Sequence, residues 1–376
     1  MQKAFRFIIL LGIVSLFGDI TYEGARSITG PFLATFGVSA AVVGFIVGFG
    51  EFAGYSLRLI SGYIADKTGR YWSMTFIGYG LILAIPLLAL ANRWEIAAML
   101  IIAERAGKAI RSPARDAMLS FATKEVGRGW GFGTHEAMDQ IGAIAGPLIF
   151  SAVFLLNYGY KEGFAIMFIP AILTLSALMF ARIEYPAPHL FEGKQAGSLN
   201  KAFWLYTMFI FASMIGFANF QLVSYHFKVQ AVYPDVYIPL LYAVAMGVDV
   251  FFALLIGKTY DKVGMKSLFL IPLLTPLILF SFSHSWMVIL GIVIWGAVMG
   301  MQETIMRAGI ADLVYPGKRS TAYGIFNTAY GLAWLAGSVT IGLLYDVSLT
   351  YLIAFVVLAE LVALALLFLL VKNEEN

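Results

Sequence analysis

The chain of 376 residues contains no cysteine and few charged side chains. The missing cysteine excludes disulfides, thiolate catalysis and cysteine metal sites. There is also no Gly-x-x-x-x-Gly-Lys-Ser/Thr sequence, so a nucleotide-driven pump is disfavoured. The four histidines show no metal-ligand spacing and stand at His135, His189, His226 and His284. The net charge of +3 is too small to predict a nucleic-acid partner, and we expect none.

Apolar residues dominate instead, at 60% of the chain against 12% charged residues. A soluble domain of this length does not need so much apolar surface to fill its core. The basic start and the apolar run at residues 5–17 are similar to a signal peptide, but no small-residue cleavage site follows. Asp19, Glu23 and Arg26 come next. We therefore expect this segment to be the first helix of an integral membrane protein.

Twelve stretches meet the requirement of about 20 mostly apolar residues for a membrane-spanning helix. The sequence thus predicts an all-α integral membrane protein with twelve transmembrane helices. These helices cover roughly residues 5–35, 38–65, 72–91, 95–119, 130–156, 163–182, 201–228, 236–257, 267–284, 286–313, 320–345 and 350–371.

The longest polar break, at about residues 183–200, lies near the middle of the chain. It predicts a cytoplasmic linker between two six-helix bundles, residues 1–182 and 201–376. Loop charge indicates the orientation, because short cytoplasmic loops are enriched in Lys and Arg. With both termini inside, fifteen basic residues fall in cytoplasmic segments and three outside, namely Arg93, Lys161 and Lys228. The chain is therefore predicted to be N-in/C-in.

A short repeat links the two halves. The stretch from Gly62 through Asp66 to Gly69 recurs from Gly257 through Asp261 to Gly264, with a Lys after each Asp. Each stretch follows one apolar segment and precedes another. Duplicated halves in a membrane protein indicate a transporter built from two bundles around a central site.

Twelve helices in two halves, with Gly-x-x-x-Asp-Lys-x-Gly-Arg after the second helix, resemble the major facilitator superfamily (MFS), and the resemblance covers the whole chain. Arg105 stands at the Arg of the family's helix-4 motif, although Lys108 replaces the Gln of that motif. Gly142, Gly146 and Pro147 are similar to the Gly-x-x-x-Gly-Pro motif of the exporter branches. The resemblance implies a monomeric secondary transporter that works by alternating access and uses no bound cofactor.

The same motifs predict gating residues. The resemblance implies a cytoplasmic clamp of Asp66, Arg70 and Asp116, which holds the outward-open state, and Arg115 is placed to join it. Gly62 would let two helices approach closely. Asp261 occupies the position in the second copy of the repeat that Asp66 occupies in the first, and it is a gating candidate for that reason. Gly142 and Gly146 lie on one helix face and serve either as packing glycines or as a hinge. Pro147 is expected to bend its helix.

Ionisable residues inside a membrane are functional candidates because each is costly unless paired or hydrated. Spacings of four and three residues place Asp19, Glu23 and Arg26 on one face of the first helix. The first half holds further candidates on its fourth and fifth helices. For proton coupling we select Asp19, Glu23, Arg26, Glu104, Arg105, Glu136 and Asp139, and for substrate binding Arg26, Lys108, His135, Asn219, Gln302, Glu303, Arg307 and Trp334.

We hypothesise that Asp19 or Glu23 exchanges a proton with the two sides of the membrane in turn. The alternative is a static salt-bridge network that neutralises the fourth helix. His135, Glu136 and Asp139 could bind a divalent cation, but a hydrogen-bonded network is the more common use of such a group, and we expect no metal site.

Three functions remain open. The first choice is a proton-coupled antiporter that exports small amphipathic organic molecules. The second is a proton-coupled uptake symporter for anionic or zwitterionic metabolites, which the basic residues of the fourth helix favour. The third is a lipid or lysolipid translocator. In each case the expected partners are a small-molecule substrate, protons for the first two, and a lipid bilayer. The expected location is the inner or plasma membrane of a prokaryote, and no enzymatic activity is expected.

Overall fold

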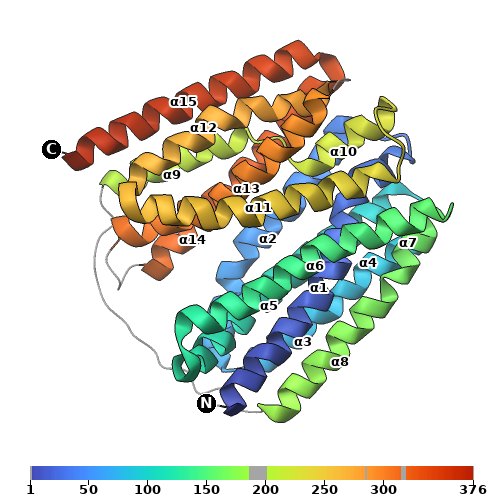
Figure 1. Cartoon of the computed structure of the whole chain (residues 1–376), viewed down its shortest axis with the longest axis vertical. Helices are drawn as coiled ribbons and strands as arrows, with labels where there is room; N and C mark the ends of the chain where they lie inside the picture. The colour runs from blue at the N-terminus through green and yellow to red at the C-terminus, as the bar shows by residue number, and fades with distance from the viewer. Residues whose placement is uncertain (1, 186–200, 284–285, 315–318, 376) are drawn as a thin grey trace. The chain divides into compact units, whose positions relative to one another are not determined.

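The computed structural model describes residues 2–185, 201–283, 286–314 and 319–375, and within these ranges it contains helices and no strands. Figure 1 shows the order of the elements along the chain. The first half contains α1 (Gln2–Ala34), α2 (Ala40–Thr68), α3 (Tyr71–Gly80), η1 (Leu81–Leu83), α4 (Ala84–Leu87), η2 (Leu88–Leu90), α5 (Trp94–Val126), α6 (Arg128–Leu155), α7 (Tyr160–Ile166) and α8 (Phe168–Glu184). The second half contains α9 (Lys201–Ile215), α10 (Phe220–Val229), α11 (Tyr237–Val263), η3 (Gly264–Phe269), α12 (Leu270–Leu274), η4 (Thr275–Phe282), α13 (Met287–Leu313), α14 (Arg319–Val347) and α15 (Leu349–Glu375).

Among the described residues, ten helical segments are long and apolar enough to cross a membrane. One of them, Tyr237–Phe282, has 46 residues and contains a chain turn at Gly264, so it accounts for two of the predicted spans. The 33-residue α5 carries too many charged residues to be counted, although it is long enough to span. With these two additions, the described helices correspond to the twelve predicted segments, and the all-α fold is confirmed.

One predicted span is interrupted. The segment predicted at 201–228 as one helix is split into α9 and α10 by a break at residues 216–219. Asn219 begins α10 as its N-cap, since its side-chain oxygen accepts a hydrogen bond of 2.9 Å from the backbone N–H of Leu222. The freed carbonyl of Ala218 accepts a bond of 2.9 Å from the indole N–H of Trp295. The break was missed because periodicity does not reveal a short irregular turn inside an apolar run.

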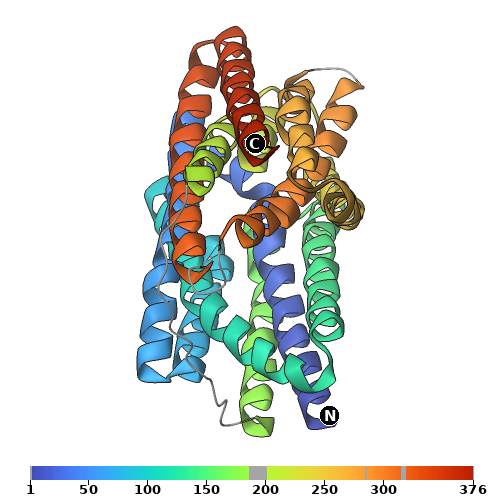
Figure 2. The same ribbon diagram turned by 90° about the vertical axis from the view of Figure 1, so that its left-hand side faces the viewer.

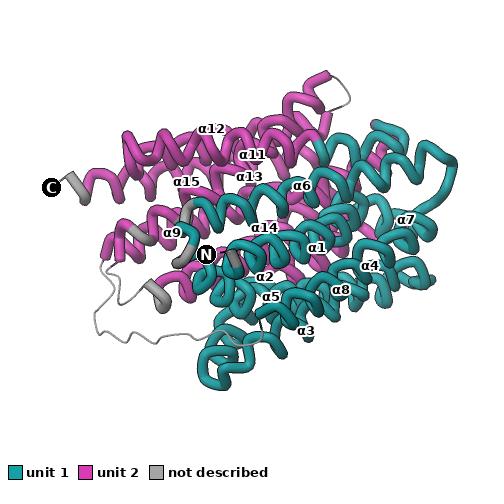
Figure 3. The backbone as a smooth tube through the Cα atoms, turned by 60° about the horizontal axis from the view of Figure 1, so that its bottom comes forward, with its two compact units in different colours: residues 1–36, 53–192, 233–243 teal, residues 37–52, 193–232, 244–376 magenta. Residues whose placement is uncertain are grey.

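The chain forms two compact units, which Figure 3 distinguishes by colour. Unit 1 holds residues 1–36, 53–192 and 233–243, and unit 2 holds residues 37–52, 193–232 and 244–376. The first part of α2 therefore packs within unit 2 and the rest within unit 1, while the first turns of α11 belong to unit 1. The predicted division at the linker 183–200 stays a prediction, and residues 186–200 of that linker lie outside the described part of the chain.

The sequence repeat has the same local structure in both places. Gly69 follows α2 with a φ of +65°, and Gly264 follows α11 with a φ of +59°. Both glycines adopt the left-handed conformation that ends a helix at little steric cost. A Cβ on Gly62 would lie 3.4 Å from Pro113 of α5, and a Cβ on Gly257 would lie 3.6 Å from Thr304 of α13. The two motifs thus make equivalent close approaches, each within its own unit.

In unit 1, α1 packs along α6 and α8, as the view in Figure 2 also shows. The backbones of α1 and α6 meet closely, because a Cβ on Gly146 would lie 2.7 Å from the backbone nitrogen of Gly24. At the start of α1, the ring of Phe7 stacks on Tyr185 at 4.4 Å and meets Trp72 edge-on at 6.0 Å. This packing holds α1 in place and aims its polar face at α5.

Candidate substrate and proton site

The ring of Tyr22 on α1 lies against three cations. The distance from the ring centroid is 4.0 Å to Nζ of Lys108, 4.5 Å to Cζ of Arg105 and 5.9 Å to Cζ of Arg26. Each is within the range of an attractive interaction between a cation and an aromatic ring. Lys108 and Arg105 of α5 therefore face the charged face of α1.

Glu23 uses both oxygens of its buried carboxylate. Oε2 accepts a hydrogen bond of 2.6 Å from the hydroxyl of Tyr242, and Oε1 lies 3.5 Å from Nη1 of Arg26. Glu23 and Tyr242 are 219 positions apart in the chain, and Tyr242 stands in the first turns of α11. A predicted proton-coupling residue thus joins two helices through one short hydrogen bond. Arg26, predicted for both roles, approaches both this carboxylate and the Tyr22 ring.

On α5, Glu104 and Arg111 pair with each other, whereas Lys108 contacts an aromatic ring. Nη2 of Arg111 lies 3.3 Å from Oε1 of Glu104, and Nη1 donates a bond of 3.4 Å to the carbonyl of Gly78 on α3. Glu104, predicted for proton coupling, is therefore committed to an ion pair within its own helix. Lys108 has no carboxylate within ion-pair distance among the described residues and contacts the Tyr22 ring instead.

A second polar group joins α1, α5 and α6. The guanidinium of Arg115 donates a bond of 2.9 Å to Oγ of Ser15, which lies 3.1 Å from Nε2 of His135. Nδ1 of His135 lies 3.6 Å from Oδ2 of Asp139, one helical turn away. The structure therefore brings His135, Asp139 and Arg115 together around one serine hydroxyl. No group of three or more His, Asp or Glu side chains suited to a metal occurs among the described residues.

Two predicted proton-coupling residues lie outside these contacts. Asp19 is partly buried on α1, and its Cβ lies 3.0 Å from where a Cβ of Gly142 would be. Glu136 is exposed, and its carboxylate accepts a bond of 3.2 Å from Gln140 one turn further along α6. The structure does not bring Glu136 to the site.

The predicted gating residues lie in unit 1, except Asp261, which belongs to unit 2. Asp66 accepts a hydrogen bond of 3.0 Å from Tyr71, and Asp116 accepts one of 2.9 Å from Arg115. Within the described part of the chain, no ion pair connects Asp66 or Arg70 with Asp116, and the clamp stays a prediction. Arg70 and Asp261 are exposed.

Gly142 and Gly146 pack tightly. A Cβ on Gly142 would collide with the carbonyl of Leu16, and one on Gly146 with the carbonyl of Ile20. Both glycines thus allow α6 to touch the backbone of α1, which supports their packing role. Pro147 follows them inside α6.

Two of the predicted substrate residues of unit 2, Asn219 and Trp334, lie at the α9–α10 break. The amide of Asn219 donates a bond of 2.9 Å to Ser338, and the ring of Trp334 stacks with Phe217 at 6.1 Å. Gln302 on α13 is buried, and neither polar atom of its side chain has a hydrogen-bond partner in the described part of the chain. Glu303 is partly buried, and the side chain of Arg307 lies outside the described residues.

Sequence reasoning missed the residues that connect these groups, chiefly Tyr22, Tyr242 and Ser15. Tyr22 carried a signal, since it lies between Asp19 and Glu23 on the charged face of α1. Tyr242 and Ser15 carried none, because a single hydroxyl residue in an apolar helix is common.

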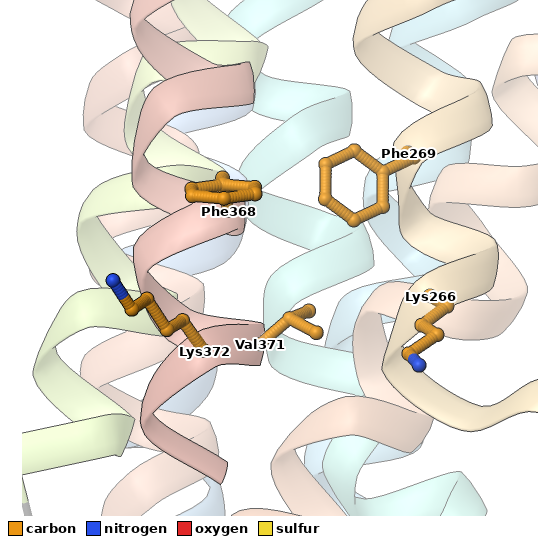
Figure 4. Close-up of a pocket in the computed structure, with 5 residues that line it drawn as sticks. All are labelled: Lys266, Phe269, Phe368, Val371 and Lys372. Atoms are coloured by element: carbon orange, nitrogen blue, oxygen red, sulfur yellow. The ribbon is translucent and has the colours of Figure 1, made fainter. Parts of the chain in front are cut away.

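A pocket of about 530 Å³ lies elsewhere in unit 2, where Lys266 and Phe269 of η3 face Phe368, Val371 and Lys372 of α15. Figure 4 shows that the two lysine side chains do not point toward each other. The pocket contains none of the predicted site residues.

The model of the Major Facilitator Superfamily matches residues 11–280 and 267–376. An uncharacterized protein of Mycobacterium tuberculosis is 40% identical over 97% of this chain and 93% of its own length. An uncharacterized MFS-type transporter of Methanocaldococcus jannaschii is 28% identical over 96% of this chain and 94% of its own. The multidrug resistance protein MdtH of Photorhabdus laumondii is 28% identical over 47% of this chain and 45% of its own.

The solved structure of the nucleoside transporter NupG is similar in fold, with a TM-score of 0.71, 16% identity and coverage of 98% of this chain and 99% of that one. The twelve helical segments, the repeated motif and these matches lead to one conclusion. The chain belongs to the Major Facilitator Superfamily of membrane transporters.

Proposed function

We propose that this MFS transporter is a proton-coupled antiporter that exports a small amphipathic organic molecule, and that Glu23 carries the coupled proton. The observation that carries the proposal is the buried Glu23 carboxylate, which is held by Tyr242 and Arg26. A titratable group in this position is costly to bury, so its presence indicates a function.

Protonation of Glu23 would weaken its interactions with Arg26 and Tyr242. The neutral carboxyl loses most of its attraction to Arg26 and its charge-assisted bond with Tyr242. Tyr242 is part of α11, a continuous helix whose first residues belong to unit 1 and whose remainder belongs to unit 2. A protonation event at Glu23 therefore acts on a helix that contributes to both units, as a coupled transporter requires.

The cations around Tyr22 supply a binding surface for the substrate. Lys108 has no ion pair among the described residues, and the Tyr22 ring offers an apolar face beside it. A substrate with an anionic or zwitterionic group and an apolar body could pair its negative charge with Lys108 and pack its apolar body on the Tyr22 ring. Its negative group would also compete with the Glu23 carboxylate for Arg26. Loss of this cation favours the protonated carboxyl, so this contact taken alone would couple anion binding to proton binding, which suits the uptake symporter considered below.

The direction of export has weaker support. The Gly142 to Pro147 pattern resembles the exporter branches, and the chain is similar over part of its length to a multidrug resistance protein. The second candidate is an uptake symporter for anionic or zwitterionic metabolites. The three cations around one tyrosine favour it, because they suit anionic cargo better than neutral cargo.

Transport in proteoliposomes with an imposed pH gradient tests the proposal, with a panel of lipophilic dyes and organic anions. We expect a panel member to move against the proton flux in the wild type. Glu23→Gln should abolish the pH-driven movement but keep exchange of labelled for unlabelled substrate, because the variant mimics a permanently protonated carboxyl.

Asp19→Asn, measured separately, shows whether the neighbouring acid shares this role. The matched control is Glu95→Gln, a partly exposed acid at the start of α5 that pairs only with Arg93 among the described residues. Full pH-driven transport in both the Glu23 and the Asp19 variants would refute proton coupling on α1. Movement of the substrate together with protons would favour the uptake symporter.

A further inference from the structure

Another buried acid, Glu360, lies in unit 2 and takes part in none of the polar contacts described above. Glu360 stands near the middle of α15 and is 1% exposed. Its Oε2 accepts a hydrogen bond of 3.2 Å from the hydroxyl of Ser213 on α9. Its Oε1 is buried and has no hydrogen-bond partner among the described residues. Half of the carboxyl group is thus left unsatisfied inside a helix bundle.

Among the residues that the structure describes, no cation compensates this acid. The helices packed against α15 are α9, α14, η3, α12 and η4, and neither α12 nor η4 contains an ionisable residue. The ionisable residues described on the others and on α15 itself are Lys201, Tyr206, Lys266, Tyr323, Tyr330, Tyr345, Asp346, Tyr351 and Lys372. None of them forms an ion pair or a hydrogen bond with Glu360, whose partner in this part of the chain is Ser213.

Two of these neighbours are bound elsewhere. The hydroxyl of Tyr206 donates to the carbonyl of Met306, and Asp346 accepts from the backbone N–H groups of Ala40 and Ala41. An ionised carboxylate without a cation is very unfavourable in this environment, because burial removes its hydration. The arrangement around Glu360 therefore fits the protonated, neutral carboxyl.

The free oxygen of Glu360 lies at the α9–α10 break. A Cβ on Gly216 would come within 2.8 Å of Oε1, so the missing side chain of this glycine makes room for the carboxyl group. The rest of the break is fastened by Trp295, which binds the Ala218 carbonyl, and by Asn219, which binds Ser338. Irregular backbone at membrane depth is tolerated where protein covers it or where it lines a water-filled cavity.

We propose that Glu360 is a second proton-exchanging carboxyl, which holds its proton while protein covers the α9–α10 break and releases it when water reaches the break. In the release step the carboxyl O–H bond breaks, the proton passes to water, and the carboxylate keeps the electron pair. Ser213 then donates its hydrogen bond to the charged form. A proton fits this site better than Na⁺, because the three side-chain oxygens of Glu360 and Ser213 are too few to surround a metal ion.

Infrared difference spectroscopy of the full chain in lipid nanodiscs, titrated with pH, tests the proposal with the proton alone as the probe. We expect the wild type to lose a protonated-carboxyl C=O band as the pH rises, and this band should be absent in Glu360→Gln. Ser213→Ala should move the band in frequency, because it removes the hydrogen bond to Oε2. Glu162→Gln, at an exposed N-terminal turn of α7, is the matched control and should leave the band unchanged.

Identical titrations of the wild type and Glu360→Gln would overturn the proposal, since Glu360 would then keep one protonation state throughout. Loss of the band on adding Na⁺ at constant pH, absent in Glu360→Gln, would overturn it in favour of a Na⁺ site. If Glu360→Gln does not fold, the frequency shift in Ser213→Ala decides the question. No substrate is used, so this outcome does not depend on whether Glu23 couples transport.

Discussion

Charged side chains of unit 1 follow two patterns that residue type alone does not separate. Arg111 and Arg115 each pair with an acid of their own helix, Glu104 and Asp116 respectively. Arg105 and Lys108 lie between Glu104 and Arg111 in sequence but face the ring of Tyr22. The acids of the first pattern neutralise Arg111 and Arg115. In the second pattern the positive charge of Lys108 is available to a ligand.

Lys108→Met tests the second pattern. The variant keeps most of the apolar stem but removes the ammonium group, so an organic anion loses a charge-assisted contact of about 1.5–3 kcal/mol. We expect the affinity for the anionic panel member to fall about 10- to 100-fold, at about 1.4 kcal/mol for each factor of ten. The change in affinity is measured by equilibrium binding of that compound to the purified wild type and variant.

Lys161→Met is the control for this experiment, because Lys161 is an exposed residue of α7 outside the site. Its affinity should equal that of the wild type. Unchanged affinity in Lys108→Met would show that the cation does not contact the substrate.

At the scale of elements, glycines decide which helices approach most closely. Gly142 and Gly146 on α6 meet the backbone of α1, whereas Gly133 on the same helix has no atom within 4 Å of the position of a Cβ. The three residues have the same intrinsic effect on helix stability, so a comparison isolates the packing. The α6–α1 contact also brings the Cβ of Asp19 to within 3.0 Å of the position of a Cβ on Gly142.

Gly146→Ala should lower the free energy of unfolding, because the new methyl group collides with backbone atoms of Ile20 and Gly24. Overpacking of this kind costs about 1–3 kcal/mol. Gly133→Ala should raise the free energy of unfolding by about 0.5–1 kcal/mol, since alanine favours helix more than glycine does. Thermal unfolding in detergent compares them, and equal stability of the two variants would contradict tight packing at Gly146.

At the scale of the whole molecule, the repeated motif makes the two halves alike at one point. Gly69 and Gly264 both adopt positive φ at the end of the second helix of their half. The equivalence extends to the close approaches of Gly62 and Gly257. The halves differ in charge, because the ion pairs described here lie in the first half of the chain, and Glu360 has no basic partner among the described residues.

Gly69→Ala and Gly264→Ala should destabilise the protein to a similar extent. An alanine in the left-handed region costs about 1–2 kcal/mol. Gly247→Ala, inside α11 with nothing within 4 Å of its Cβ position, is the control and should not destabilise. Thermal unfolding in detergent measures the stability of each variant. A loss of stability in only one of the two glycine variants would show that the two copies of the motif are not structurally equivalent.

The positions of the helices were predictable from sequence because bilayer thickness sets the length of an apolar span. The predicted span 286–313 and the observed α13, Met287–Leu313, differ by one residue at the start. The α9–α10 break was not predictable, since its partners Trp295 and Ser338 come from α13 and α14. For the candidate site, spacing placed Glu23 and Arg26 on one face, but it could not identify Tyr242 as the partner of Glu23.

The sequence by itself determined the membrane class, the helical segments and the duplicated motif, because these depend on local composition and on residues close together in the chain. Tertiary structure alone decided which cations surround Tyr22, which acids remain without a basic partner, and which parts of α2 and α11 pack with which unit. These features depend on side chains from helices far apart in the sequence, whose meeting is set by the packing of whole helices.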